Sequence, residues 1–191
     1  MRMHELNKVL LSSNKLKVLN YLILYADRKF YESEISKNLN ISNGSVNAIL
    51  NEFVESGLLK REQSGPLKIV SVLMDDKFLK EYRAFINMLA LQPLVEDLKK
   101  DAIKVVLFGS FARGENTQKS DIDLYILTYK KKGVMEIINK YSETEKVLKH
   151  RIQSIIENPL KKSGDKVFIR QVEMGKVLWE REVNEEYEDE L

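Results

Sequence analysis

Two aspartates at alternate positions are the residues best suited to chemistry. Asp121 and Asp123 open a stretch, 121–128, that alternates in polarity like a β-strand. Residues i and i+2 of a strand share a face, so both carboxylates should point to one site while Ile122 and Leu124 point into a core. Two carboxylates this close repel each other unless a cation lies between them, and Mg²⁺ prefers carboxylate oxygens. We therefore expect a magnesium site at Asp121 and Asp123.

A turn of small residues precedes the two aspartates. The apolar run 103–108 ends at Gly109 and Ser110, and ten residues separate Ser110 from Asp121. Glycine lets a phosphate approach the backbone closely, and the serine hydroxyl and nearby amides can hydrogen-bond to phosphate oxygens. Arg113 could pair with a phosphate or act as a structural salt-bridge partner. Phosphoryl-type transfer uses metal ions to bridge a triphosphate, so the turn and the aspartates together predict a site for a metal-bound nucleotide.

The stretches 105–114 (VVLFGSFARG) and 120–124 (SDIDL), in this order and spacing, carry a resemblance to a known family. They resemble the DNA polymerase β-type nucleotidyltransferase superfamily, and most closely its minimal nucleotidyltransferases. The resemblance implies an α+β fold with a mixed sheet, Mg²⁺ as cofactor and an NTP, ATP in the first place, as substrate. It also implies transfer of a nucleoside monophosphate to an acceptor hydroxyl. That acceptor could be a protein side chain, such as a tyrosine of a HEPN-type toxin partner, or an RNA end.

One part of the superfamily's pattern is missing. The superfamily supplies a third metal-binding carboxylate from a neighbouring strand, and the strand expected here, 151–156, contains no acid. Gln153 or Arg151 would take that place; a glutamine oxygen can still bind Mg²⁺ weakly, whereas an arginine would oppose it. Substitutes for the missing acid are Glu145, Glu157 and Glu173. Two hypotheses follow: an enzyme, and a non-catalytic transcriptional regulator whose C-terminal domain senses nucleotide or mediates assembly.

The N-terminal part shows a different pattern. A short helix is expected over 32–39, a turn at 40–41, and a third helix that Ser42 caps and Gly57 ends. Two strands with a turn at 63–66 follow, forming a hairpin. The stretch from Ser33 to Val72 resembles the winged helix-turn-helix family, which implies a mostly α-helical domain with a β-hairpin wing and a recognition helix for the major groove.

The residues expected to contact DNA lie on the third helix and the wing. Asparagine can read adenine, serine can bond a base or a phosphate, and lysine and arginine can neutralise phosphates. The set is Asn43, Ser45, Asn47, Lys60, Arg61 and Lys68. The third helix carries no basic residue, and Ala48 stands where many winged helices have one. A role in protein contacts or dimerisation therefore remains the alternative to DNA binding.

The sequence as a whole predicts a mixed two-domain protein. We expect a winged helix-turn-helix domain over 1–74, a helical connector over 75–101, the nucleotidyltransferase-like domain over 102–181 and an acidic tail over 182–191. The absence of cysteine excludes disulfides and fits a reducing compartment, and no apolar run is long enough to span a membrane. The expectation is a cytoplasmic homodimer that binds DNA and nucleotide, with no membrane partner.

Overall fold

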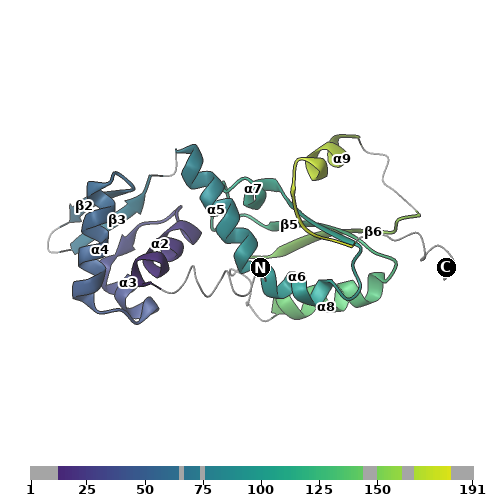
Figure 1. Ribbon diagram of the computed structural model, residues 1–191, viewed down its shortest axis with the longest axis horizontal. Helices are drawn as coiled ribbons and strands as arrows, with labels where there is room; N and C mark the ends of the chain where they lie inside the picture. Colours follow the sequence, from purple (N-terminus) through teal and green to yellow (C-terminus); the bar gives the residue numbers. More distant parts are fainter. Residues whose placement is uncertain (1–12, 65–66, 74–75, 144–149, 161–165, 182–191) are drawn as a thin grey trace. The chain divides into compact units, whose positions relative to one another are not determined.

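The computed structural model describes residues 13–64, 67–73, 76–143, 150–160 and 166–181 (Figure 1). Contacts within the chain divide it into two compact units. Unit 1 consists of Met1–Leu89 and Arg113–Lys119, and unit 2 of Ala90–Ala112 and Ser120–Leu191. The division differs from the expected domains, because the region expected as a connector is shared between the units. The expected acidic tail, 182–191, lies outside the described residues.

Unit 1 alternates short helices with a small antiparallel sheet. Its elements are α2 (Asn14–Leu24), β1 (Phe30–Tyr31), α3 (Glu32–Leu39), α4 (Asn43–Glu55), β2 (Leu59–Ser64), β3 (Leu67–Val72) and most of α5 (Lys77–Ala90). The strands lie in the order β1-β3-β2, and β2 and β3 form a hairpin. The bounds of α3 and α4 agree closely with the expected helices, but β2 includes Gln63 and Ser64, which were expected in the turn, because they pair with Lys68 and Leu67.

Local signals begin and end the helices of unit 1. The hydroxyl of Ser13 accepts from the amide of Leu16 at the start of α2, and Ser42 accepts from the amide of Ser45 at the start of α4. Each bond satisfies an amide that has no partner inside its helix. Asn40 ends α3 in the left-handed conformation, with φ 53°. The chain therefore turns where its sequence predicts.

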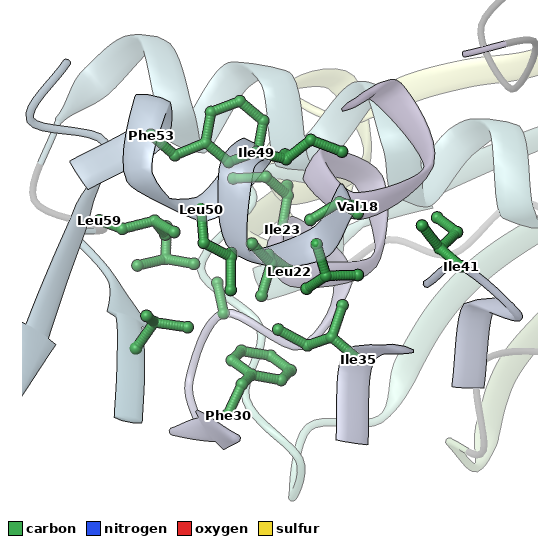
Figure 2. Close-up of a cluster of buried hydrophobic side chains, with 14 residues drawn as sticks. Val18, Leu22, Ile23, Phe30, Ile35, Ile41, Ile49, Leu50, Phe53 and Leu59 are labelled. Atoms are coloured by element: carbon green, nitrogen blue, oxygen red, sulfur yellow. The ribbon is translucent and has the colours of Figure 1, made fainter. Parts of the chain in front are cut away.

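One hydrophobic core holds α2, α3 and α4 on the sheet (Figure 2). Helices α2 and α4 each bury several residues at helical spacing, and α3 contributes Ile35. Burying one such side chain fully contributes about 1.5–3 kcal/mol. Core residues with no exposed surface are Val18, Leu22, Ile23, Phe30, Ile35, Val46, Leu50 and Val70.

The segment Arg113–Lys119 packs as part of unit 1. Asn116, 2% exposed, accepts a hydrogen bond of 2.9 Å from Asn87 on α5. The amide of Gln118 donates to Asp27 at 2.6 Å. Gly114 has a φ of 66°, and a Cβ added there would overlap the carbonyl oxygen of Lys80. The loop thus depends on a glycine at the point where it meets the backbone of α5.

Unit 2 is built on a mixed four-stranded sheet. Its elements are α6 (Gln92–Leu98), β4 (Lys104–Phe108), α7 (Gly109–Ala112), β5 (Ile122–Leu127), α8 (Lys131–Glu143), β6 (Ile152–Glu157), α9 (Lys166–Glu173) and β7 (Lys176–Glu180). The strand order is β6-β5-β4-β7, with β5 and β6 parallel and the other pairs antiparallel. The mixed sheet expected for this half is therefore confirmed.

The two faces of this sheet are covered differently. Helices α6 and α8 pack together on one face, and α9 lies over the other (Figure 1). Ile122, Leu124 and Ile126 of β5 have no exposed surface, so the face beneath α6 and α8 forms the core. The residues between them are half-buried on the α9 face. No helix among the described residues is long and apolar enough to cross a membrane.

We predict that Gly114→Ala lowers the free energy of unfolding by about 2 kcal/mol or more, since the methyl group meets backbone at a positive φ. Gly44→Ala is the matched control, because nothing lies within 4 Å of a Cβ there and the position is helical. The control should be neutral or up to about 1 kcal/mol more stable. Urea denaturation of both variants measures the difference. Equal stability of Gly114→Ala and wild type would contradict the packing of this loop.

The hydroxyl of Tyr141 on α8 should lose its proton at a higher pH than an ordinary tyrosine does. Its hydroxyl lies 2.9 Å from Asp97 Oδ2 and 2.9 Å from the carbonyl oxygen of Pro93. Desolvation, followed by the hydrogen bond to Asp97, raises the pKa of Tyr141 from 10.0 to about 12. A raised folded-state pKa stabilises the fold below pH 10, and this contribution is lost as the pH rises from 10 to about 12.

Tyrosinate absorbance and denaturation at alkaline pH measure this effect. Wild type should show one more late-titrating tyrosine than Tyr141→Phe, and the stability difference between them should shrink above pH 10. A stability difference that is constant across this range would contradict the prediction.

Candidate functional site

The two aspartates lie at the beginning of β5. Asp123 is the second residue of this strand, and Asp121 directly precedes it. Both are half-buried, whereas Ile122 between them is fully buried. The alternation places Asp121 and Asp123 on the α9 face of the sheet. Asp123 pairs with Phe108 of β4 on one side and with Gln153 of β6 on the other.

Gly109 lies against Asp123. It follows Phe108, has a φ of 70° and begins the short turn α7. A Cβ at Gly109 would overlap Oδ2 of Asp123, so only glycine leaves this carboxylate its place. Ser110, the next residue, is half-buried in the same turn. The structure therefore brings the turn that contains Gly109 and Ser110 up against Asp123.

His150 joins this site, and the sequence had pointed to no role for it. Its Nδ1 lies 2.7 Å from the carbonyl oxygen of Ser120, the residue before Asp121. A carbonyl only accepts hydrogen bonds, so Nδ1 carries the proton in this contact. The imidazole also meets the ring of Phe111 edge-on, with centroids 4.9 Å apart. His150 thus ties the turn after Gly109 to the start of β5.

Gln153 stands at the position expected for the third carboxylate. In the parallel pairing of β5 and β6, Asp123 is opposite Gln153 and Ile122 is opposite Ile152. Alternation then places Gln153 on the face that carries Asp123, and it places Arg151, whose carbonyl accepts from Ile122, beside Asp121. The strand that should supply an acid therefore offers an amide and a guanidinium.

Of the other acids considered for the metal site, the structure describes Glu157 and Glu173. Glu157 pairs in register with Leu127, four residues beyond Asp123, and accepts a hydrogen bond of 3.1 Å from Tyr125. Glu173 lies at the end of α9, and Glu145 lies outside the described residues. Among the residues that the structure describes, no three acidic, histidine or cysteine side chains are grouped to hold a metal.

Arg113 pairs within its own loop. Its Nε donates to Glu115 Oε2 at 2.8 Å, and its side chain is 60% exposed. Glu115 also lies 3.8 Å from Lys80. Within unit 1, the structure therefore shows Arg113 as the ion-pair partner of Glu115.

A groove lies between α9 and the sheet in unit 2. Its volume is about 570 Å³, within the range of small-molecule sites. Burial and the hydrogen bond to Glu157 raise the pKa of Tyr125 in this groove to about 12. Phe168 of α9 packs with its ring 6.0 Å from those of both Phe108 and Tyr125. Lys104, Leu127 and Glu157 line the groove, so it lies toward the end of β4 and β5 that is opposite to Asp123.

The residues expected to contact DNA fall into two groups in unit 1. Asn43, Ser45, Lys60 and Lys68 are exposed. Lys60 lies 3.2 Å from Glu62 with 62% of its side chain exposed. Asn47 and Arg61 are half-buried, and both hydrogen-bond to Glu32. The sequence did not predict the contacts of this acid, because its partners are distant in the chain.

A comparison with protein families assigns the second part of the chain. Residues 91–184 match the family described as "Polymerase beta, Nucleotidyltransferase". The matched range contains the Gly109-Ser110 turn, both aspartates and the mixed sheet. It identifies this part as a nucleotidyltransferase-type domain, in agreement with the resemblance of its motifs. A search of curated proteins finds no match to the chain.

We predict that Gln153→Glu raises the affinity for a divalent metal about tenfold or more, because it adds a third carboxylate beside Asp123. Calorimetric titration with Mg²⁺ and Mn²⁺ measures the affinity. Gln171→Glu, the same change at an exposed position of α9, is the matched control and should leave it unchanged. A Gln153→Glu protein that binds metal no better than wild type would place residue 153 away from the aspartates.

Proposed function

We propose that this protein is a nucleotidyltransferase that moves a nucleoside monophosphate, AMP in the first place, from an NTP to a hydroxyl of a protein or RNA. The observation that carries the proposal is the arrangement of Asp121 and Asp123 on one face of β5, with Gly109 against Asp123. The missing side chain of Gly109 gives the Asp123 carboxylate its place beside the turn, which fixes where a metal-bound phosphate would be held.

The side chains at this site fit a magnesium ion. Mg²⁺ is commonly held by one or two carboxylates together with substrate phosphates, and Asp121 and Asp123 supply that number. The amide oxygen of Gln153 is a further neutral ligand opposite Asp123. When bound, the metal would neutralise charge that develops on the phosphates during transfer.

The residues around the aspartates have separate tasks in this proposal. Gly109 leaves the Asp123 carboxylate in place, and the hydroxyl and amide of Ser110 bind phosphate oxygens. His150 holds Ser120 against the turn at Phe111, which fixes the start of β5. We assign His150 a positioning role, since its Nδ1 contacts backbone. Phe168, which lines the groove, packs against the ring of Phe108.

Unit 1 would serve as a winged helix-turn-helix domain that binds DNA, with the whole chain acting as a homodimer. The order of its elements, helix α2, helices α3 and α4, then the β2–β3 hairpin, supports this assignment. Exposed Asn43 and Ser45 at the start of α4 and exposed Lys60 and Lys68 on the hairpin are suited to the groove and the phosphates.

A second function is favoured by one observation, the glutamine at position 153. With two carboxylates, the domain could bind a nucleotide without transferring it. The protein would then be a transcriptional regulator whose DNA-binding domain responds to nucleotide.

The test is incubation of the full-length protein with ATP labelled at the α-phosphate, Mg²⁺ and native lysate. We expect label on a protein or an RNA, and Asp123→Asn should lower transfer at least about 100-fold, since a lost metal ligand removes several kcal/mol of charge stabilisation. Asp97→Asn is the matched control, because Asp97 lies on α6, across the sheet, and its amide still accepts from Tyr141.

The outcomes separate the two functions. Transfer that survives in Asp123→Asn would contradict the proposed site. Nucleotide binding by equilibrium dialysis with no transfer to any acceptor would support the regulator. A protein that neither binds nor transfers a nucleotide would refute both.

A further inference from the structure

Glu32, the first residue of α3, binds side chains from two other elements. Its Oε2 accepts a hydrogen bond of 2.8 Å from Asn47 Nδ2 on α4. Its Oε1 lies 3.2 Å from Arg61 Nη2 on β2, in an ion pair. One carboxylate therefore holds one residue of the candidate recognition helix and one residue of the hairpin.

Asn51 closes these contacts into a ring. Arg61 Nη1 donates to Asn51 Oδ1 at 2.6 Å, and Asn51 Nδ2 donates to Asn47 Oδ1 at 3.1 Å. We call Glu32, Asn47, Asn51 and Arg61 the Glu32 ring. The ion pair is part-buried, with 23% of the Arg61 side chain and 20% of the Glu32 side chain exposed. Screening by water is thus weaker here than at the exposed pair of Lys60 and Glu62.

The ring leaves Arg61 incompletely bonded. Its Nε is buried and has no hydrogen-bond partner within the described part of the chain. A buried donor without a partner is unfavourable, so an arrangement that exposes this guanidinium to a new acceptor gains a hydrogen bond. Arginine pairs with phosphate in the same two-pronged geometry as with carboxylate.

We propose that Glu32 competes with nucleic-acid phosphate for Arg61 and Asn47, and so holds the reading face of unit 1 in a low-affinity state. In this state the Glu32 carboxylate keeps its place on Arg61 when duplex DNA binds, and a phosphate takes that place, with release of Asn47, only when the charge of Glu32 is removed. The inference rests on the DNA-binding function proposed above. It adds that Glu32 on α3, which lies outside the candidate recognition helix and the hairpin, sets the affinity for DNA.

Charge explains why Glu32 should weaken binding. A carboxylate bonded to Asn47 and Arg61 repels phosphates that approach these residues, and it withholds a cation that would otherwise neutralise one of them. The exposed lysines remain able to bind phosphates, so wild type binds weakly rather than not at all. Removing the charge of Glu32 should both tighten binding and add about one phosphate contact.

The test measures binding of the full-length protein to a fluorescent DNA duplex of mixed sequence at several salt concentrations. Glu32→Gln should bind the duplex about tenfold tighter than wild type. The slope of log K against the logarithm of the salt concentration should be steeper by about one. Glu34→Gln is the matched control. It removes the same charge from the same helix, but Glu34 pairs with Arg28, at 2.9 Å and with similar exposure. A gain in Glu34→Gln equal to that in Glu32→Gln would overturn the proposal.

A double-mutant cycle assigns the gain to Arg61. Arg61→Ala alone should change the affinity of wild type less than twofold, because Glu32 already occupies this residue. In the Glu32→Gln background, Arg61→Ala should abolish the tenfold gain. If Arg61→Ala weakens wild type as much as Lys60→Ala does, Arg61 already contacts DNA and the proposal is wrong.

A measurement without DNA separates this proposal from the proposed DNA binding. Modification of arginines by phenylglyoxal, followed by mass spectrometry of peptides, reports how accessible each guanidinium is. Arg61 should react several-fold faster in Glu32→Gln than in wild type, whereas Glu34→Gln should accelerate only Arg28. Unchanged reactivity of Arg61 would refute the competition by Glu32. If Arg61 reacts faster in Glu32→Gln but no variant binds duplex DNA, Glu32 does hold Arg61 and the proposed DNA binding is wrong.

Discussion

The alternation of side chains along β5 is the constraint on which the candidate site depends. Three residues of this strand, Ile122, Leu124 and Ile126, are fully buried under α6 and α8. Their burial fixes the register of the strand, since a shift by one residue would move the whole apolar set to the other face. The register in turn fixes Asp123 between Phe108 and Gln153. Packing energy on one face of the sheet thus positions carboxylates on the other.

Much of the fold could be predicted from sequence because local chemistry determines it. Caps such as Ser13 and Ser42 lie within a few residues of the amides they bond, so short windows reveal them. The spacing of Gly109-Ser110 and the two aspartates is likewise a property of one short stretch. The family match to residues 91–184 agrees with that interpretation.

The remainder of the site could not be predicted, because it depends on pairings between distant segments. The sequence left Gln153 and Arg151 as alternatives; only the register of β6 against β5 assigns Gln153 to the place opposite Asp123. His150 carries no motif, and its importance comes from the carbonyl of Ser120, thirty residues earlier. Glu32 looks like an ordinary acid in the first turn of a helix until its partners on α4 and β2 are known.

The loop Arg113–Lys119 has a consequence for how the protein can be made. Because this segment completes unit 1, that unit is discontinuous in the chain. During synthesis, the buried side chain of Asn87 cannot bond to Asn116 until β4, α7 and the loop itself have been made. Unit 1 therefore cannot complete this hydrogen bond before part of unit 2 has been synthesised. A fragment that ends after α5 would leave the side chain of Asn87 without its native hydrogen bond to Asn116. A fragment that begins after α5 would keep the loop Arg113–Lys119 but lose the partner of Asn116 on α5.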